Sequence, residues 1–263
     1  MKALLITIDS LRKDHLSCYG YKRNTTPFLD SFAEQNLVFE NAYSSSPHTR
    51  EAIPSILTGK KPEDAVNKTN TSIELEGETI PDKIPKEVRS SGITSGVYLT
   101  PFENHDQGFD RFSTDYTSNK SFTSKYLKYL KDLVKNQQFR TGEEINKEVI
   151  RSLKESQDSF VWAHYMDAHH PYNNFDKWHW GSKISRRKIQ FLFRKANHAP
   201  SLISEREKET LINVYDNSIR ALDKKLEKLF DKIPEETKVF ITSDHGESFG
   251  ENNDFEHPRK LRD

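Results

Sequence analysis

The stretch "ALLITID", residues Ala3 to Asp9, is a short apolar run that ends abruptly in an aspartate. Such a run is typical of a strand that is buried on both faces of a parallel sheet. Further runs of the same kind are "GVYLT" (Gly96–Thr100), "FVWAHYM" (Phe160–Met166) and "KVFIT" (Lys238–Thr242). We therefore predict a buried sheet in which Ala3–Ile8 is the first strand.

Helical patterns separate these runs, and capping residues mark where the helices begin. The expected starts are Thr26 with Pro27, Thr141 with Glu144, and Ser204 with Glu207. Alternation of strands and helices predicts an α/β fold, an α/β/α sandwich around a mainly parallel sheet. We expect a single domain over residues 1–263, because no low-complexity linker divides the chain.

Two segments are predicted to be loops, and a third is predicted to be a surface helix. The loops are "ENHDQGFDRF" (Glu103–Phe112) and "PYNNFDKWHWGSK" (Pro171–Lys183). The basic, aromatic segment Ser121–Gln138 has the pattern of an amphipathic helix on the surface.

Composition excludes some partners. Lys plus Arg and Asp plus Glu both total 40, so the net charge is zero and no global field favours nucleic acid. The basic cluster Ser185–Lys188 is better interpreted as a solvated helix face than as an anion site.

Cys18 is the single cysteine and cannot form an internal disulfide. The N-terminus does not resemble a signal peptide, and no apolar run is long enough to span a membrane. We therefore expect a cytoplasmic protein.

The ends of the predicted strands carry the candidate chemistry. The first strand ends in Asp9, the third in Asp167 and the last in Asp244, which His245 follows directly. Ligands bind beyond the carboxyl ends of strands in an open parallel sheet, where residues distant in sequence meet. Each aspartate alone is more typical of a turn or a helix cap. Together with the imidazole, the carboxylates indicate a site for one divalent cation, Ca²⁺, Mg²⁺, Mn²⁺ or Zn²⁺.

Such a metal would give a role to Thr49 in "SSSPHTREAIPSILTG" (Ser44–Gly59). A threonine hydroxyl is a weak nucleophile at neutral pH, and coordination to a divalent cation activates it. The alternative is that Thr49 only caps a helix. Because a proline inside a helix removes a hydrogen bond, Pro54 favours a helix that begins near Ile53 and leaves Thr49 on a loop.

Several long blocks carry a family resemblance. They are "LLITIDSLRKDHLSCYGYKRNTTPFLDSFAEQNLVFENAYSSSP", "ILTGKKP", "HYMDAHHPY", "YDNSIRALD" and "TSDHGESFGE". In this order, over nearly the whole chain, they resemble the sulfatase family of the alkaline phosphatase superfamily. The resemblance implies an alkaline-phosphatase-like sandwich with a metal-dependent nucleophile.

The resemblance also assigns expected roles. Metal ligands fall on Asp9, Thr49, Asp244 and His245, and the register to "LTG" places the nucleophile at Thr49. His169 and His257 match positions that contact the ester group. Weaker candidates for stabilising transition-state charge are Arg50 and Lys60.

The chain departs from the family pattern at three places. Typical sulfatases have a cysteine that is converted to formylglycine, whereas this chain has Thr49, so threonine-using phosphatases and phosphotransferases are the closer analogy. Ser10 stands where the family usually has a second aspartate. No histidine follows Asp167 at the D-x-x-x-H spacing of two-metal relatives. This difference favours a site with one metal. We also expect the domain to lack the usual C-terminal subdomain.

The expected function is therefore a metal-dependent hydrolase or transferase that acts on phosphate or sulfate esters. The substrate would be a small-molecule, glycan or lipid-headgroup ester. One alternative is a sulfatase proper that uses Thr49 directly, which is disfavoured because a sulfate ester on threonine would hydrolyse slowly. Another is a catalytically silent, metal-stabilised binding module. Oligomeric state and the exact metal stay open.

Overall fold

The computed structural model describes residues 1–68, 72–96, 98–115, 139–172, 175 and 177–257. These residues form two compact units, each assembled from three segments of the chain. The sheet unit comprises Met1–Thr7, Thr49–Met166 and Lys232–Thr242. The strand-end unit comprises Ile8–His48, Asp167–Asp231 and Ser243–Asp263. That the chain functions as one domain stays a prediction.

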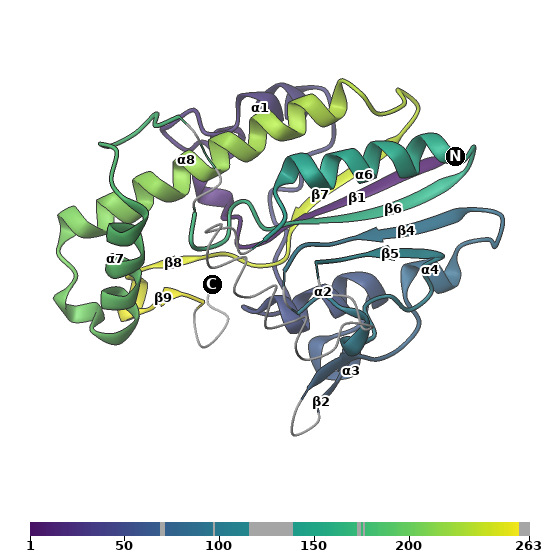
Figure 1. The fold of residues 1–263 in the computed structure, drawn as a ribbon, viewed down its shortest axis with the longest axis horizontal. Coiled ribbons are helices and arrows are strands. Elements are labelled where there is room, and N and C mark those ends of the chain that lie inside the picture. Colours follow the sequence, from purple (N-terminus) through teal and green to yellow (C-terminus); the bar gives the residue numbers. More distant parts are fainter. Residues whose placement is uncertain (69–71, 97, 116–138, 173–174, 176, 258–263) are drawn as a thin grey trace. The chain divides into compact units, whose positions relative to one another are not determined.

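A five-stranded sheet in the order β5-β4-β6-β1-β7 dominates the sheet unit (Figure 1). Its strands are β1 (Lys2–Ile8), β4 (Arg89–Ile93), β5 (Arg111–Ser113), β6 (Ser159–Tyr165) and β7 (Lys238–Ser243). Three neighbouring strands of the sheet are parallel, because β4 pairs in parallel with both β5 and β6. The predicted α/β fold with a mainly parallel sheet is confirmed.

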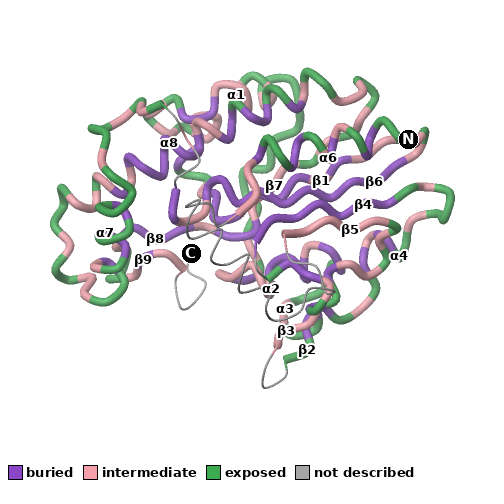
Figure 2. Tube along the Cα trace, in the orientation of Figure 1, coloured by how far each residue is buried: buried purple, intermediate pink, exposed green. Residues whose placement is uncertain are grey.

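Strand β6 explains why the sheet was recognisable from sequence. All of its residues are buried (Figure 2). Trp162 shares a core cluster with residues of α2 (Thr49–Thr58). Tyr165, on the opposite face, donates a 2.7 Å hydrogen bond to Asn146 of α6 (Gly142–Glu155). Because helices cover both faces of the strand, it needs no polar alternation, as its apolar run predicted.

The prediction of a strand at Gly96–Thr100 is wrong, since the strand in this part of the chain is β4. Its sequence, "RSSGI", contains small polar residues and no apolar run, yet all but Arg89 are buried. Close packing explains why this buried strand contains small residues: a Cβ added at Gly92 would lie 2.5 Å from Cδ2 of Phe112. The same pairing makes Arg111–Ser113 a strand, so the predicted loop Glu103–Phe112 is wrong at its end.

Three helices begin where the sequence predicted. They are α1 (Pro27–Glu34), α6 and α8 (Glu205–Phe230). The capping boxes at Thr141 and Ser204 are both formed. Within the strand-end unit, α1 packs against α8 through Phe28 and Phe32, whose rings lie 4.9 and 5.1 Å from that of Phe230.

Helix α2 begins at Thr49 and contains Pro54, so the predicted start near Ile53 is wrong. The helix gives up only the bond that position 54 would donate to the carbonyl of Arg50. Buried apolar residues of α2, among them Ile53 and Leu57, stabilise it against this loss.

The remaining elements are short, apart from one helix. They are α3 (Pro62–Ala65), α4 (Ile80–Lys83), α7 (Arg186–His198), β2 (Val66–Lys68), β3 (Ile73–Leu75), β8 (Ser248–Phe249) and β9 (Phe255–Glu256), with 3-10 turns at Lys13–His15, Ser17–Tyr19, Pro101–Glu103, Pro200–Leu202 and Glu251–Asn253. The predicted helix Ser121–Gln138 lies outside the described residues. Among the residues that are described, no helix is long and apolar enough to cross a membrane.

Candidate active site

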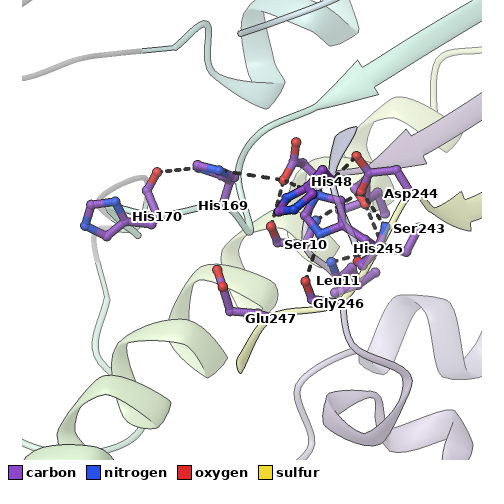
Figure 3. Close-up of polar contacts among 12 residues, drawn as sticks. Ser10, Leu11, His48, His169, His170, Ser243, Asp244, His245, Gly246 and Glu247 are labelled. Atoms are coloured by element: carbon purple, nitrogen blue, oxygen red, sulfur yellow. Dashed lines mark hydrogen bonds and ion pairs between the residues drawn. The ribbon is translucent and has the colours of Figure 1, made fainter. Parts of the chain in front are cut away.

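Two carboxylates and an imidazole meet in the strand-end unit, directly after β1 and β7 (Figure 3). Nε2 of His245 lies 3.8 Å from Oδ1 of Asp9 and 3.7 Å from Oδ2 of Asp244. These side chains are 1 to 2% exposed. The structure thus brings together three of the four side chains that were predicted to hold a metal, Asp9, Asp244 and His245.

Backbone and hydroxyl contacts join the two loops that carry these side chains. The amide of Ser10 donates to Oδ1 of Asp244 over 3.2 Å. Oγ of Ser243 lies 3.0 Å from the carbonyl oxygen of Ile8 and 2.6 Å from that of His245, one of which accepts its hydrogen, and it accepts from the amide of Leu11 over 3.1 Å. A displacement of either loop would therefore disturb the other.

Ser10 supports the site instead of adding a charge to it. Its hydroxyl donates a 2.7 Å hydrogen bond to Oδ1 of Asp9, and its side chain is fully buried. The residue has φ of 59°, a left-handed conformation that is uncommon outside glycine. With serine here, Asp9 and Asp244 supply the two formal negative charges of the cluster.

The chemistry of this donor set fits a divalent cation. Burial alone would lower the pKa of His245, but the carboxylates of Asp244 and Asp9 outweigh it and raise the pKa to about 9. The carboxylates therefore favour a positive charge at their centre. The separations are also close to the roughly 3.4 Å between two ligands of a tetrahedral metal with bonds of about 2.1 Å. Carboxylate oxygen with imidazole nitrogen suits Zn²⁺ or Mn²⁺ better than Ca²⁺.

More histidines surround this cluster. Nε2 of His169 lies 3.9 Å from Oδ1 of Asp9. The ring of His257 lies 4.7 Å from that of His245, 5.4 Å from that of His169 and 5.7 Å from that of His48. Burial, followed by the charges of His245 and His169, lowers the pKa of His257 to about 3, so its imidazole is neutral. The structure thus places both predicted ester-contacting histidines beside the carboxylate cluster.

Sequence reasoning missed His48, Glu247 and Tyr172. Glu247 is 4% exposed, and Tyr172 donates its hydroxyl hydrogen to Oε2 of this carboxyl. Burial raises the pKa of Glu247 to about 7. The available signals were positional: His48 precedes Thr49, and Glu247 lies two residues after His245. Nothing in the sequence connected Tyr172 with the site.

Asp167, the third aspartate at a strand end, has another partner. Its Oδ1 accepts a 2.6 Å bond from Nζ of Lys225 on α8, and both side chains are buried. This buried ion pair agrees with the expectation that Asp167 is not a metal ligand, although the number of metals stays a prediction. The next imidazole, His170, packs against Phe193, with ring centroids 4.4 Å apart.

Thr49, Arg50 and Lys60 belong to the sheet unit. Thr49 is the first residue of α2, and a peptide bond joins it to His48 of the strand-end unit. The guanidinium of Arg50 lies 3.2 Å from Oε1 of Glu103 and 4.9 Å from the ring centre of Tyr98. A protein carboxylate already pairs with this cation, which weakens the case for Arg50 as an anion ligand. Lys60 lies along Gly77.

The fold is of the alkaline phosphatase type, as the resemblance implied. The model of the sulfatase family matches residues 2–262, and the chain belongs to that family.

Similar proteins include phosphoethanolamine transferases. The sequence is 26% identical over 258 residues to phosphoethanolamine transferase EptA of Helicobacter pylori, covering 94% of this chain and 42% of that protein. The chain thus spans less than half the length of this relative. The C-terminal periplasmic domain of EptC from Campylobacter jejuni matches with a TM-score of 0.64 and 18% identity, over 99% of this chain and 74% of that one. The corresponding domain from Escherichia coli, in complex with Zn, matches with a TM-score of 0.61 and 19% identity, over 94% and 64%.

These similarities contradict the expectation of a cytoplasmic protein, because both solved structures are periplasmic domains. The expectation rested on a single cysteine and on apolar runs too short to span a membrane. Neither feature indicates a compartment, because a domain with a core of this size also folds without a disulfide in an oxidising environment.

Proposed function

We propose that the protein is a metal-dependent transferase or hydrolase of phosphate esters that uses Thr49 as its nucleophile. The observation that carries the proposal is the buried cluster of Asp9, Asp244 and His245, flanked by His169 and His257. Threonine at the nucleophile position favours phosphate over sulfate esters, because formylglycine cannot form there.

In the proposed reaction, Oγ1 of Thr49 attacks phosphorus. The bond from Oγ1 to phosphorus forms as the Thr49 hydroxyl loses its proton to solvent, while the bond from phosphorus to the oxygen of the leaving alcohol breaks and that oxygen takes up a proton. Water or an acceptor hydroxyl then attacks the phosphothreonine and releases Thr49. Attack by water results in hydrolysis, and attack by an acceptor hydroxyl results in transfer.

Asp9, Asp244 and His245 would hold the metal, together with Thr49. A divalent cation bound there would activate the hydroxyl and neutralise the charge that develops on the phosphoryl oxygens. His169 would protonate the leaving group or stabilise its charge, and the neutral imidazole of His257 would donate a hydrogen bond to the ester. These histidines are suited to that role because they lie beside the carboxylate cluster and are not among the residues that would hold the metal.

We propose phosphoethanolamine as the transferred group, because EptA of Helicobacter pylori matches along 94% of this chain. A lipid headgroup would be the donor and a glycan or lipid hydroxyl the acceptor. Action on such molecules agrees with a periplasmic or extracellular location.

The test is an assay of the zinc-loaded chain with nitrophenyl phosphate, bis(nitrophenyl) phosphate, nitrocatechol sulfate and phosphatidylethanolamine. We expect turnover of a phosphate ester and, with phosphatidylethanolamine, a phosphoethanolamine adduct on the peptide that contains Thr49. Thr49→Ala should abolish both while keeping the fold, and Thr49→Ser should keep part of the activity because it retains a hydroxyl. The matched control is Thr58→Ala, whose hydroxyl bonds the carbonyl of Pro54 in the same helix.

Near wild-type turnover by Thr49→Ala would show that Thr49 only caps α2 and that water attacks the ester. Exclusive turnover of the sulfate ester would instead support the second candidate, a sulfatase proper, which the family match favours.

A further inference from the structure

The loop that carries Asp9 has an unusual conformation that one side chain of α8 holds in place. The hydroxyl of Tyr215 donates to the carbonyl of Ser10 over 2.7 Å and accepts from the amide of Arg12 over 2.9 Å. The side chain of Tyr215 is fully buried, so neither backbone group could turn to water instead. Both hydrogen-bonding functions of this hydroxyl therefore serve the loop.

The residue at the centre of this contact is Ser10, whose φ of 59° is costly for a residue with a side chain. This conformation directs the amide of Ser10 to Asp244 and its hydroxyl to Asp9. Without the Tyr215 hydroxyl, relaxation of Ser10 toward negative φ would move both hydrogen bonds. The two carboxylates would then lose a shared support.

Tyr215 also reaches the second ligand loop through Arg12. The guanidinium of Arg12 donates a 2.8 Å bond to the carbonyl of Glu247, two residues after His245. The ring of Tyr215 is held by neighbours that a phenylalanine would keep: its centroid lies 5.0 Å from those of both His15 and Phe249. Replacing tyrosine by phenylalanine therefore removes the hydroxyl and little else.

We infer that Tyr215 is a positioning residue for the metal site, acting through the left-handed conformation of Ser10. The inference rests on the proposed function only in that the cluster binds a divalent cation. Helix α8 thereby supports the metal site, although it carries none of the predicted metal ligands or ester-contacting residues.

The test compares the zinc affinity of the full chain, measured by competition with a chromophoric chelator, in wild type, Tyr215→Phe and Tyr165→Phe. The last is the matched control, because it also removes a buried hydroxyl, one that bonds Asn146 of α6 in the sheet unit. We expect affinity about 10 to 100 times weaker in Tyr215→Phe, the usual effect of removing a support of metal ligands. Tyr165→Phe should match wild type. The visible spectrum with Co²⁺ should change only in Tyr215→Phe.

Equal affinities of Tyr215→Phe and Tyr165→Phe would overturn the inference. A wild type that binds no zinc would refute the proposed metal site instead, so the two failures are distinguishable. Ser10→Gly gives an independent test that also applies if Tyr215→Phe alone does not fold. Glycine adopts positive φ at little cost, so Ser10→Gly with Tyr215→Phe should bind zinc as Ser10→Gly does. A further tenfold loss in the double variant would contradict the proposed route through Ser10.

Discussion

For single residues, neighbouring carboxylates decide which of the buried imidazoles carry charge. His245 lies between two carboxylates, which raise its pKa to about 9, whereas burial lowers the pKa of His257 to about 3. The two imidazoles thus differ in charge at neutral pH although they lie a few ångströms apart. Asp244 and Asp9 together outweigh burial at His245, whereas at His257 burial and the charges of His245 and His169 outweigh the effect of Asp9.

Buried His105 in the sheet unit provides a test of this reasoning away from the site. Burial lowers its pKa from 6.5 to about 3, and its side chain is 1% exposed. As pH falls, the unfolded chain takes up this proton before the folded chain does, so the unfolded state gains stability below pH 6.5. Between pH 7 and pH 5, wild type should lose about 2 kcal/mol of unfolding free energy through this group.

His105→Gln removes the titrating group, so its unfolding free energy should fall less over that pH range. Urea denaturation at both pH values measures the difference. His198→Gln, at an exposed histidine of α7, is the control and should behave as wild type. An equal acid loss in His105→Gln and wild type would mean that His105 is protonated in the folded state.

The residues of the site were predictable to different extents. Asp9, Asp244 and His245 follow apolar runs, so strand order and the carboxyl-end rule sufficed to bring them together. The contacts of Glu247 with Tyr172 and of Asp167 with Lys225 join segments far apart in sequence, and periodicity contains no information about such pairs.

At the scale of elements, local chemistry predicted helix starts better than strands. Capping boxes at Thr141 and Ser204 satisfy their own backbone groups, so they act locally and could be read directly. Strand β4 is buried without being apolar, because Phe112 packs where a side chain at Gly92 would be. Such a strand is determined by its neighbours, and a hydrophobicity pattern cannot find it.

Gly92→Ala tests this explanation of β4. The added methyl group would lie 2.5 Å from Cδ2 of Phe112, so the ring or the strand must move. We expect a loss of about 1 to 3 kcal/mol of unfolding free energy, although alanine is otherwise better than glycine in a strand. Ser91→Ala on the same strand adds no atoms and should cost less. A Gly92→Ala chain as stable as wild type in urea would refute the packing argument.

In the whole molecule, the strand-end unit gathers the side chains of the candidate site from all three of its segments. Asp9 and His48 come from the first, His169 and Tyr215 from the second, and Asp244 and His245 from the third. A metal held by the first and last of these segments would cross-link parts of the chain that are separate in the unfolded state. It would therefore stabilise the native state by mass action.

Compartment could not be derived at this scale. Location depends on how a chain is targeted, and the folded residues do not encode it. The similar structures are periplasmic domains, which is why the expectation of a cytoplasmic protein fails.

The proposed metal site is tested most directly by a calorimetric titration of the chelator-treated chain with Zn²⁺, accompanied by thermal melts. We predict one equivalent of bound zinc, a higher melting temperature with metal, and loss of both effects in Asp9→Asn and Asp244→Asn. Asp231→Asn, at the exposed end of α8, should bind as wild type does. No binding by the wild type, or wild-type affinity in Asp244→Asn, would contradict the claim that Asp9, Asp244 and His245 hold a catalytic metal.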